Sequence, residues 1–403
     1  MRSFQLLNGV FGYRGMPARQ LAGILAVAMV LAVEPATQAL HGVRWEQVQS
    51  APISAAEFSH IIKEFSEEDG FFRSDNFISN ETSYLHVVDK MQSIGCTGGA
   101  YIGVGPEQNF TYIAKIRPQI AFIVDIRRQA VIQHLMYKAI FHLADTRAAF
   151  LACLFSKPVS AEANLEPDAP IDKIIAYFET TPSDPLAFRK NLQLIEKTIQ
   201  EDFRFALSDR DRISLEYLYT AFRDENLNIQ YRSGGPNWPG SPWGTFPTLR
   251  DILVERDLKG RPGNFLVARA DYEFVRDLQE HNRIIPVVGD FSGSKALAGV
   301  AEYLKRHEYW VSAFYTSNVE QYLFANGVFR SFAENVARLP ITEKSIFIRA
   351  FPNMREPHPA KISGHRLTTL LEKISVFLKD NDQGRYQDYW SLVTTNYIAA
   401  DQQ

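Results

Sequence analysis

The stretch from residue 98 to residue 125, GGAYIGVGPEQNFTYIAKIRPQIAFIVD, restricts the possible folds of this chain more than any other. A short apolar strand, residues 100–103, ends in a glycine turn. A helix should follow, because Pro106 has the fixed φ of a first helical position and apolar residues recur three and four positions after Phe110. Residues 119–125 then form a nearly continuous apolar strand, typical of strands buried on both faces of a parallel sheet. This pattern predicts a βαβ unit.

The same alternation resumes after residue 280. Beyond the βαβ unit we expect strands in IIPVVGD (284–290), YWVSAFYTS (309–317) and KSIFIRA (344–350), with a candidate final strand in YWSLVTT (389–395). Helices are expected between them, including residues 127–144 and 365–380. Ser317 and Glu320 have the spacing of a capping box for a short helix that Asn326 and Gly327 end. The predicted fold class is α/β, with a doubly wound, mostly parallel sheet.

An inserted helical subdomain is predicted between the two halves of the sheet. From residue 156 to residue 250 helical periods replace the strand pattern, and this region includes the Gly- and Pro-rich loop RSGGPNWPGSPWGTFP. The loop carries Trp238 and Trp243, and it could be a lid over a site or a surface loop held by two packed tryptophans. The predicted domains are residues 1–39, 40–155, 156–250 and 251–403, the second and fourth forming the sheet domain.

The N-terminal segment resembles an export signal. Three arginines precede the apolar run LAGILAVAMVLAV, residues 21–33, and a small-residue stretch ends at Ala39. Such a signal would direct the protein to the periplasm or the outside of the cell. Two alternatives stay open: an uncleaved anchor that leaves the domain facing the cytoplasm, and a buried N-terminal helix.

Charge and cysteine content restrict the partners. The net charge is −3 and the charges are mixed along the chain, so the composition does not indicate a nucleic-acid partner. The only cysteines, Cys96 and Cys153, could form one bridge or remain two buried thiols. No His/Cys spacing suggests a metal. A small-molecule ligand is the expected partner.

The expected ligand site lies beyond the carboxyl ends of the strands, where ligands bind in open α/β sheets. The acidic Asp125 follows Gly103 by twenty-two positions and is placed to hold ribose hydroxyls, which points to a nucleoside. Glu107 would oppose a pyrophosphate at the helix start and favours a cationic ligand, unless it points into water. The expected cofactor-binding residues are Gly103, Gly105, Glu107, Asp125 and Asp290, and the expected substrate-side residues are Thr316, Ser317, Asn318 and Tyr322.

The order of YIGVG, AFIVD, PVVGD and SAFYTSN resembles the class I S-adenosylmethionine-dependent methyltransferases over about residues 98–145 and 275–400. The chain is also similar to uncharacterised bacterial proteins that share GVGPEQNFTYI, DIRRQ and SNVEQYLF. The resemblance implies that Gly103 and Gly105 line the methionine end of the cofactor, Asp125 takes the ribose and Asp290 contacts the adenine. The sequence departs from this family at Tyr101 and Glu107, where an acidic residue and a glycine are usual, and it lacks the double proline of amino-group methylating members.

Two functions therefore remain in view: a methyltransferase of unknown acceptor, and an exported, non-catalytic binding or scaffold protein that keeps the fold. An exported enzyme would lack S-adenosylmethionine, a cytoplasmic metabolite. A nicotinamide oxidoreductase ranks below both because of Glu107.

Further polar residues gave weaker signals. His358, His365 and three arginines, Arg349, Arg355 and Arg366, could bind an anion or act as a base, or form a solvated polar loop, which is the plainer expectation. His134 and His142 are expected at polar or boundary positions of their helix. Arg127 and Arg128 could pair with Asp125 or with a substrate carboxylate. No Gly-x-Ser-x-Gly elbow or P-loop occurs, so no motif supports a hydrolase or a kinase.

Overall fold

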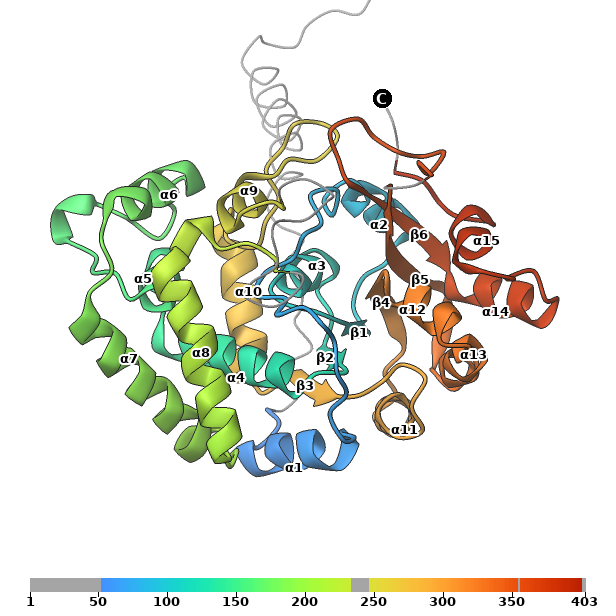
Figure 1. The fold of residues 1–403 in the computed structure, drawn as a ribbon, viewed down its shortest axis with the longest axis horizontal. Helices are drawn as coiled ribbons and strands as arrows, with labels where there is room; N and C mark the ends of the chain where they lie inside the picture. The colour runs from blue at the N-terminus through green and yellow to red at the C-terminus, as the bar shows by residue number, and fades with distance from the viewer. Residues whose placement is uncertain (1–51, 233–245, 354–355, 401–403) are drawn as a thin grey trace, which may run out of the picture. The chain divides into compact units, whose positions relative to one another are not determined.

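The protein has an α/β fold built on one mostly parallel sheet (Figure 1). The structure is a computed structural model that describes residues 52–232, 246–353 and 356–400. The N-terminal segment 1–39, the two loop tryptophans and Arg355 lie outside the described residues. Residues 51–403 form one compact unit. Within the described ranges, no helix is both long and apolar enough to cross a membrane.

The sheet has the strand order β3-β2-β1-β4-β5-β6. All neighbouring pairs are parallel except β5 and β6, which are antiparallel. From β1 the chain moves outward to β2 and β3, and it then returns to place β4 on the other side of β1. This is the strand order of a doubly wound Rossmann-like sheet, with its switch point between β1 and β4. The strands are β1 (Ala100–Gly103), β2 (Ile120–Asp125), β3 (Ile284–Val288), β4 (Val311–Ser317), β5 (Ile341–Pro352) and β6 (Leu367–Lys373).

Helices cover both faces of the sheet, and a group of helices separates β2 from β3 in the chain. One face packs against α1, α11, α13 and α14, and the other against α3 and α4, on which α10 packs in turn (Figure 1). The helices before β4 are α1 (Ala55–Phe65), α2 (Val88–Ile94), α3 (Gln108–Ile116), α4 (Arg128–Leu143), α5 (Arg147–Phe155), α6 (Ile171–Thr180), α7 (Pro185–Lys197), α8 (Asp209–Glu225), α9 (Leu249–Val254), α10 (Arg269–Glu280) and α11 (Ala296–Arg306). Those after β4 are α12 (Val319–Ala325), α13 (Phe329–Ala337), α14 (Ile374–Asp382) and α15 (Tyr389–Thr394).

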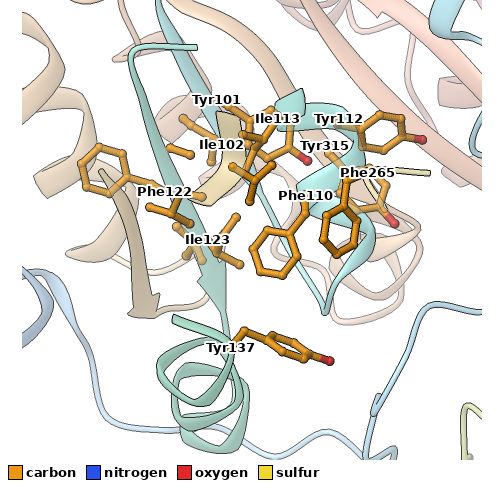
Figure 2. Packing of buried hydrophobic residues seen from close by; sticks show 14 of the residues in the cluster. Tyr101, Ile102, Phe110, Tyr112, Ile113, Phe122, Ile123, Tyr137, Phe265 and Tyr315 are labelled. Carbon is orange, nitrogen blue, oxygen red and sulfur yellow. The ribbon is translucent and has the colours of Figure 1, made fainter. Parts of the chain in front are cut away.

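Aromatic side chains fill the core on both faces of the sheet. Phe122 of β2 stacks with Phe65 of α1, their ring centroids 6.2 Å apart. On the opposite face Phe110 of α3 meets Phe265, and Figure 2 shows this pair on the side of the strands away from Phe122. Tyr315 of β4 lies on the α3 side as well, 5.2 Å from the ring of Tyr112. The strands β1, β2 and β3 are short and buried along their whole length, as the apolar runs predict.

Two elements near the C-terminus differ from the sequence prediction. Residues 367–373 form a strand rather than the start of a helix, because they complete the sheet by pairing antiparallel with β5, and only residues 374–382 are helical. The predicted final strand at 389–395 is the helix α15. Its first turn is closed by a capping box between Asp388 and Ser391, a local signal that outweighs the strand propensity of its aromatic and β-branched residues.

Three further expectations about single positions are wrong. Ser317 does not cap α12: Asn318 holds the N-cap position without a side-chain bond, and the Ser317 hydroxyl bonds elsewhere. Arg349 and His358 do not lie in a solvated loop, since each is only 2% exposed. His134 is also 2% exposed, because α4 is covered by the sheet on one side and by α8 and α10 on the other.

Cys96 and Cys153 are free thiols rather than a disulfide. Cys96 is buried and its Sγ donates to the carbonyl of Ser312 at 3.3 Å. Burial raises the pKa of both thiols to about 12, so neither is a ready nucleophile.

Candidate functional site at the carboxyl edge of the sheet

A segment of the chain, residues 66–83, runs across the carboxyl ends of the strands. We call it the crossing segment; it follows α1 and precedes α2 (Figure 1). It makes hydrogen bonds in turn at the carboxyl ends of β3 and β2, at the turn after β1 and at the end of β4. Its last residue, Ser83, bonds Thr369 near the start of the antiparallel β6. The carboxyl ends are those beyond which ligands bind in such sheets, so the segment forms part of any site there.

At the β3 end the crossing segment is held by one carboxylate. Glu67 accepts hydrogen bonds from the backbone N–H groups of Asp290, Lys295 and Ala296, at 3.1, 2.8 and 2.9 Å. Asp290 itself is partly exposed and accepts from the backbone and hydroxyl of Ser292, both at 2.8 Å. The Glu67 side chain therefore takes up these three backbone N–H groups after β3.

At the β2 end the link is an arginine. Arg127 donates to both oxygens of Asp125, at 3.0 Å from Nε and 2.9 Å from Nη2. Its Nη1 donates to the carbonyls of Ser74 and Asp75 in the crossing segment. Burial would raise the pKa of Asp125, but the Arg127 charge and its hydrogen bonds outweigh that effect and hold the pKa below its usual value. Arg128 pairs instead with Asp211 of α8.

The turn after β1 contains two glycines in different surroundings. At Gly103 a Cβ would stand 2.0 Å from Oδ1 of Asn109, so this glycine is required by packing. Gly105 has a φ of +79°, and nothing lies within 4 Å of the place where its Cβ would be. His134 Nε2 lies 2.8 Å from the Gly105 carbonyl, which can only accept, so the ring carries its proton on Nε2. The turn thus leaves open space at Gly105.

At the switch point two carboxylates are buried. Glu81, in the crossing segment, is 2% exposed, and Glu107, just before α3, is 5% exposed. Oε1 of Glu81 accepts from the Tyr315 hydroxyl at 2.7 Å and from the Ser317 hydroxyl at 2.5 Å, and Oε2 accepts from Gln108 Nε2 at 3.2 Å.

Glu107 turns inward rather than toward water. Both of its oxygens accept from the backbone N–H of Ser79, at 3.2 and 3.3 Å. Burial raises the pKa of Glu107 to about 7 and raises the pKa of Glu81 as well. Among the described residues, neither carboxylate is paired with Lys or Arg. The switch point is therefore acidic and short of positive charge.

The structure brings some of the predicted site residues together and separates others. Ser317 donates to Glu81, and the charge of Glu81 contributes to the raised pKa of Glu107. The Gly105 carbonyl bonds His134, and the charge of Asp125 acts on the pKa of the same ring. Thr316 is fully buried and donates to Glu320, while Asn318 and Tyr322 are partly exposed. Asp290 lies apart, beside Glu67.

Sequence reasoning missed Glu81. The segment ISNETSY has no periodicity that marks a functional residue, and its partners are 27 and 236 positions away. Only the path of the chain over the strand ends brings them together.

A second buried charge cluster lies between β5, β6 and α12. Arg349 donates to Glu320 at 2.9 Å and also to Glu372, whose other oxygen accepts from Tyr386 at 2.8 Å. Within the described part of the chain, no group of three or more His, Cys, Asp or Glu residues could hold a metal ion. Two cavities lie away from the strand ends, one of about 260 Å³ beside Arg147 and Tyr272 and one of about 30 Å³ beside His86 and Asp257.

Residues 76–401 match the model of a family described as a domain of unknown function, DUF7790. The chain belongs to this family. The match begins inside the crossing segment and includes Glu81 and every strand of the sheet. No curated protein matches the chain.

Proposed function

We propose that this DUF7790 protein is an S-adenosylmethionine-dependent methyltransferase-like protein whose acceptor is unknown. The observation that carries the proposal is the acidic switch point, where Glu81 and Glu107 are buried beside neutral partners. A buried carboxylate without a cation costs several kcal/mol, and a cationic ligand would offset that cost. The sulfonium of S-adenosylmethionine supplies a positive charge, whereas the pyrophosphate of a dinucleotide would be repelled.

The β1 and β2 ends support a nucleoside in the same place. Gly105 leaves room for close approach of a ligand to the backbone. A carboxylate offers about four lone pairs, and Asp125 uses three of them on Arg127, two at Oδ1 and one at Oδ2. One acceptor position at Oδ2 is left for a ribose hydroxyl.

A second candidate function is an exported, non-catalytic binding or scaffold protein. Two observations favour it. Arg127 already neutralises Asp125, and the crossing segment fills the edge with hydrogen bonds made within the chain. In this case the acidic residues would serve the crossing segment rather than a ligand.

Calorimetric titration of residues 40–403 with S-adenosylmethionine, S-adenosylhomocysteine and NAD tests the proposal. We expect micromolar binding of the first two and none of NAD. Glu81→Gln should weaken the binding of S-adenosylmethionine at least tenfold. It should change the binding of S-adenosylhomocysteine less, because only S-adenosylmethionine carries a positively charged sulfur. The exposed Glu302→Gln is the matched control.

A second variant tests the ribose contact. Asp125→Ala should weaken the binding of both S-adenosyl compounds by about 1.5–3 kcal/mol. No binding of any of the three compounds would favour the second candidate.

A further inference from the structure

Ser317 has an unusual backbone position. It is the last residue of β4, its φ is +54°, and Asn318 then begins the turn into α12. The left-handed region is uncommon for a residue with a Cβ, and such positions gather at functional sites. A strained turn between a strand and a helix is also the setting that exposes a nucleophilic serine at the edge of a sheet. Ser317 is partly exposed, while Thr316 before it and Glu320 after it are buried.

A base is already in contact with this hydroxyl. Ser317 Oγ donates to Oε1 of Glu81 at 2.5 Å. The carboxylate is held from two other sides, by the Tyr315 hydroxyl at 2.7 Å and by Gln108 Nε2 at 3.2 Å. Enzymes that form covalent intermediates share this arrangement: the nucleophile lies within hydrogen-bonding distance of a base, and a third group orients the base.

We propose that Ser317 is an acyl-accepting nucleophile and that Glu81 is its general base. The Ser317 oxygen attacks the carbonyl carbon of an ester or thioester while Glu81 takes the hydroxyl proton. The bond to the leaving alcohol or thiol then breaks, and that group takes the proton from Glu81. Water repeats the sequence, giving a carboxylic acid and restoring the Ser317 hydroxyl. No redox partner is required.

The charges around Ser317 favour an ester or thioester substrate over a phosphate ester. Glu81 and Glu107 are two buried carboxylates near the β1 and β4 ends that have no Lys or Arg partner among the described residues, and they would repel a phosphate group. The carbonyl of an ester carries no net charge and is not excluded. This inference goes beyond the proposed function, because the reaction needs no nucleoside and its nucleophile lies at β4 rather than at the β1 and β2 ends.

Labelling of the full chain with a fluorophosphonate probe tests the assignment. We expect one adduct per chain by intact mass, located on Ser317 by peptide mapping. Ser317→Ala should remove the adduct. Glu81→Gln should slow labelling by about 10²-fold or more, as loss of a general base does. Ser375→Ala is the matched control, because Ser375 also donates to a glutamate, Glu343, but lies in α14; its labelling should equal that of the unaltered chain.

Two results would overturn the inference. One is absence of any Ser317 adduct between pH 5 and pH 9 on the unaltered chain, which depends on no variant being folded. The other is labelling of Ser317 at an unchanged rate in Glu81→Gln, shown by circular dichroism to be folded. Neither result depends on whether S-adenosylmethionine binds, so the failure of this inference and the failure of the proposed function are distinguishable.

Discussion

Gly103 and Gly105 stand two positions apart in the turn after β1, and different physical requirements keep each of them a glycine. The sequence predicts both as residues that approach a ligand. The structure shows that Gly103 makes room for Asn109 and Tyr101, whereas Gly105 adopts a left-handed φ beside open space. A one-dimensional pattern cannot separate these roles, because the atom that excludes a Cβ at Gly103 belongs to the following helix.

Gly103→Ala should destabilise the protein more than Gly105→Ala. At residue 103 the added methyl would overlap Asn109 Oδ1, and relief requires side chains to leave their places in a close-packed core, which typically costs about 1–3 kcal/mol or more. At residue 105 the cost is left-handed strain alone, about 1–2 kcal/mol. Urea unfolding of both variants measures the difference. Equal losses would mean that the Asn109 contact does not decide the residue at 103.

Glu107 should make stability depend on pH. Its pKa is about 7 in the folded protein and about 4.5 when unfolded, so between these values the folded state binds more protons. Stability contributed by this group is therefore greatest below pH 4.5 and falls as pH rises to 7, by up to about 1.4 kcal/mol per pH unit. Glu107→Gln removes the ionisation and keeps an acceptor for Ser79. Its stability relative to the unaltered chain should rise from pH 4.5 to 7 and then level off.

Urea unfolding across pH 4.5–8 measures this, with the exposed Glu302→Gln of α11 as control. A constant difference between Glu107→Gln and the unaltered chain would show that Glu107 is not buried as described.

At the scale of elements, the parallel strands could be predicted and the antiparallel end could not. The strands β1 to β4 and the part of β5 from residue 345 onward are largely apolar runs buried on both faces, so their composition alone marks them. In β6 two threonines stand among leucines that also fit a helical period, and pairing with β5 decides the outcome. The crossing segment was not predictable at all, because it has no regular structure and its order comes from contacts with several strand ends.

The crossing segment should depend on Glu67 at its β3 end. Glu67→Ala leaves the N–H groups of Asp290, Lys295 and Ala296 without their carboxylate acceptor. We expect the amides of residues 295 and 296 to exchange hydrogen at least tenfold faster, and stability to fall by about 1–3 kcal/mol. Hydrogen-exchange mass spectrometry measures this. The neighbouring Glu68→Ala is exposed and should change neither quantity. Unchanged exchange in Glu67→Ala would mean that backbone contacts alone hold the segment.

At the scale of the whole molecule, the helices between β2 and β3 share the core of the sheet. Aromatic contacts run from α3 to α4 through Phe110 and Phe141, centroids 5.3 Å apart, and on to Phe150 of α5 at 4.6 Å. Tyr137 of α4 continues the contact to Phe222 of α8. The sequence correctly places helices in this region, but the boundary it draws near residue 155 falls inside one continuous hydrophobic cluster.

A continuous core predicts one cooperative unfolding transition for residues 51–403. Two substitutions test this: Phe188→Ala in the helical region, where Phe188 stacks on Tyr219 with centroids 5.1 Å apart, and Phe347→Ala in β5. Each should lower the midpoint of the same single unfolding transition, because a buried Phe→Ala change costs about 3–5 kcal/mol wherever it lies in a shared core. Circular dichroism and tryptophan fluorescence should then give the same curve. Leu186→Ala on the same helix as Phe188 is the control, since Leu186 is 69% exposed. If Phe188→Ala instead produced two transitions and moved only one, the helical region would be a folding unit of its own.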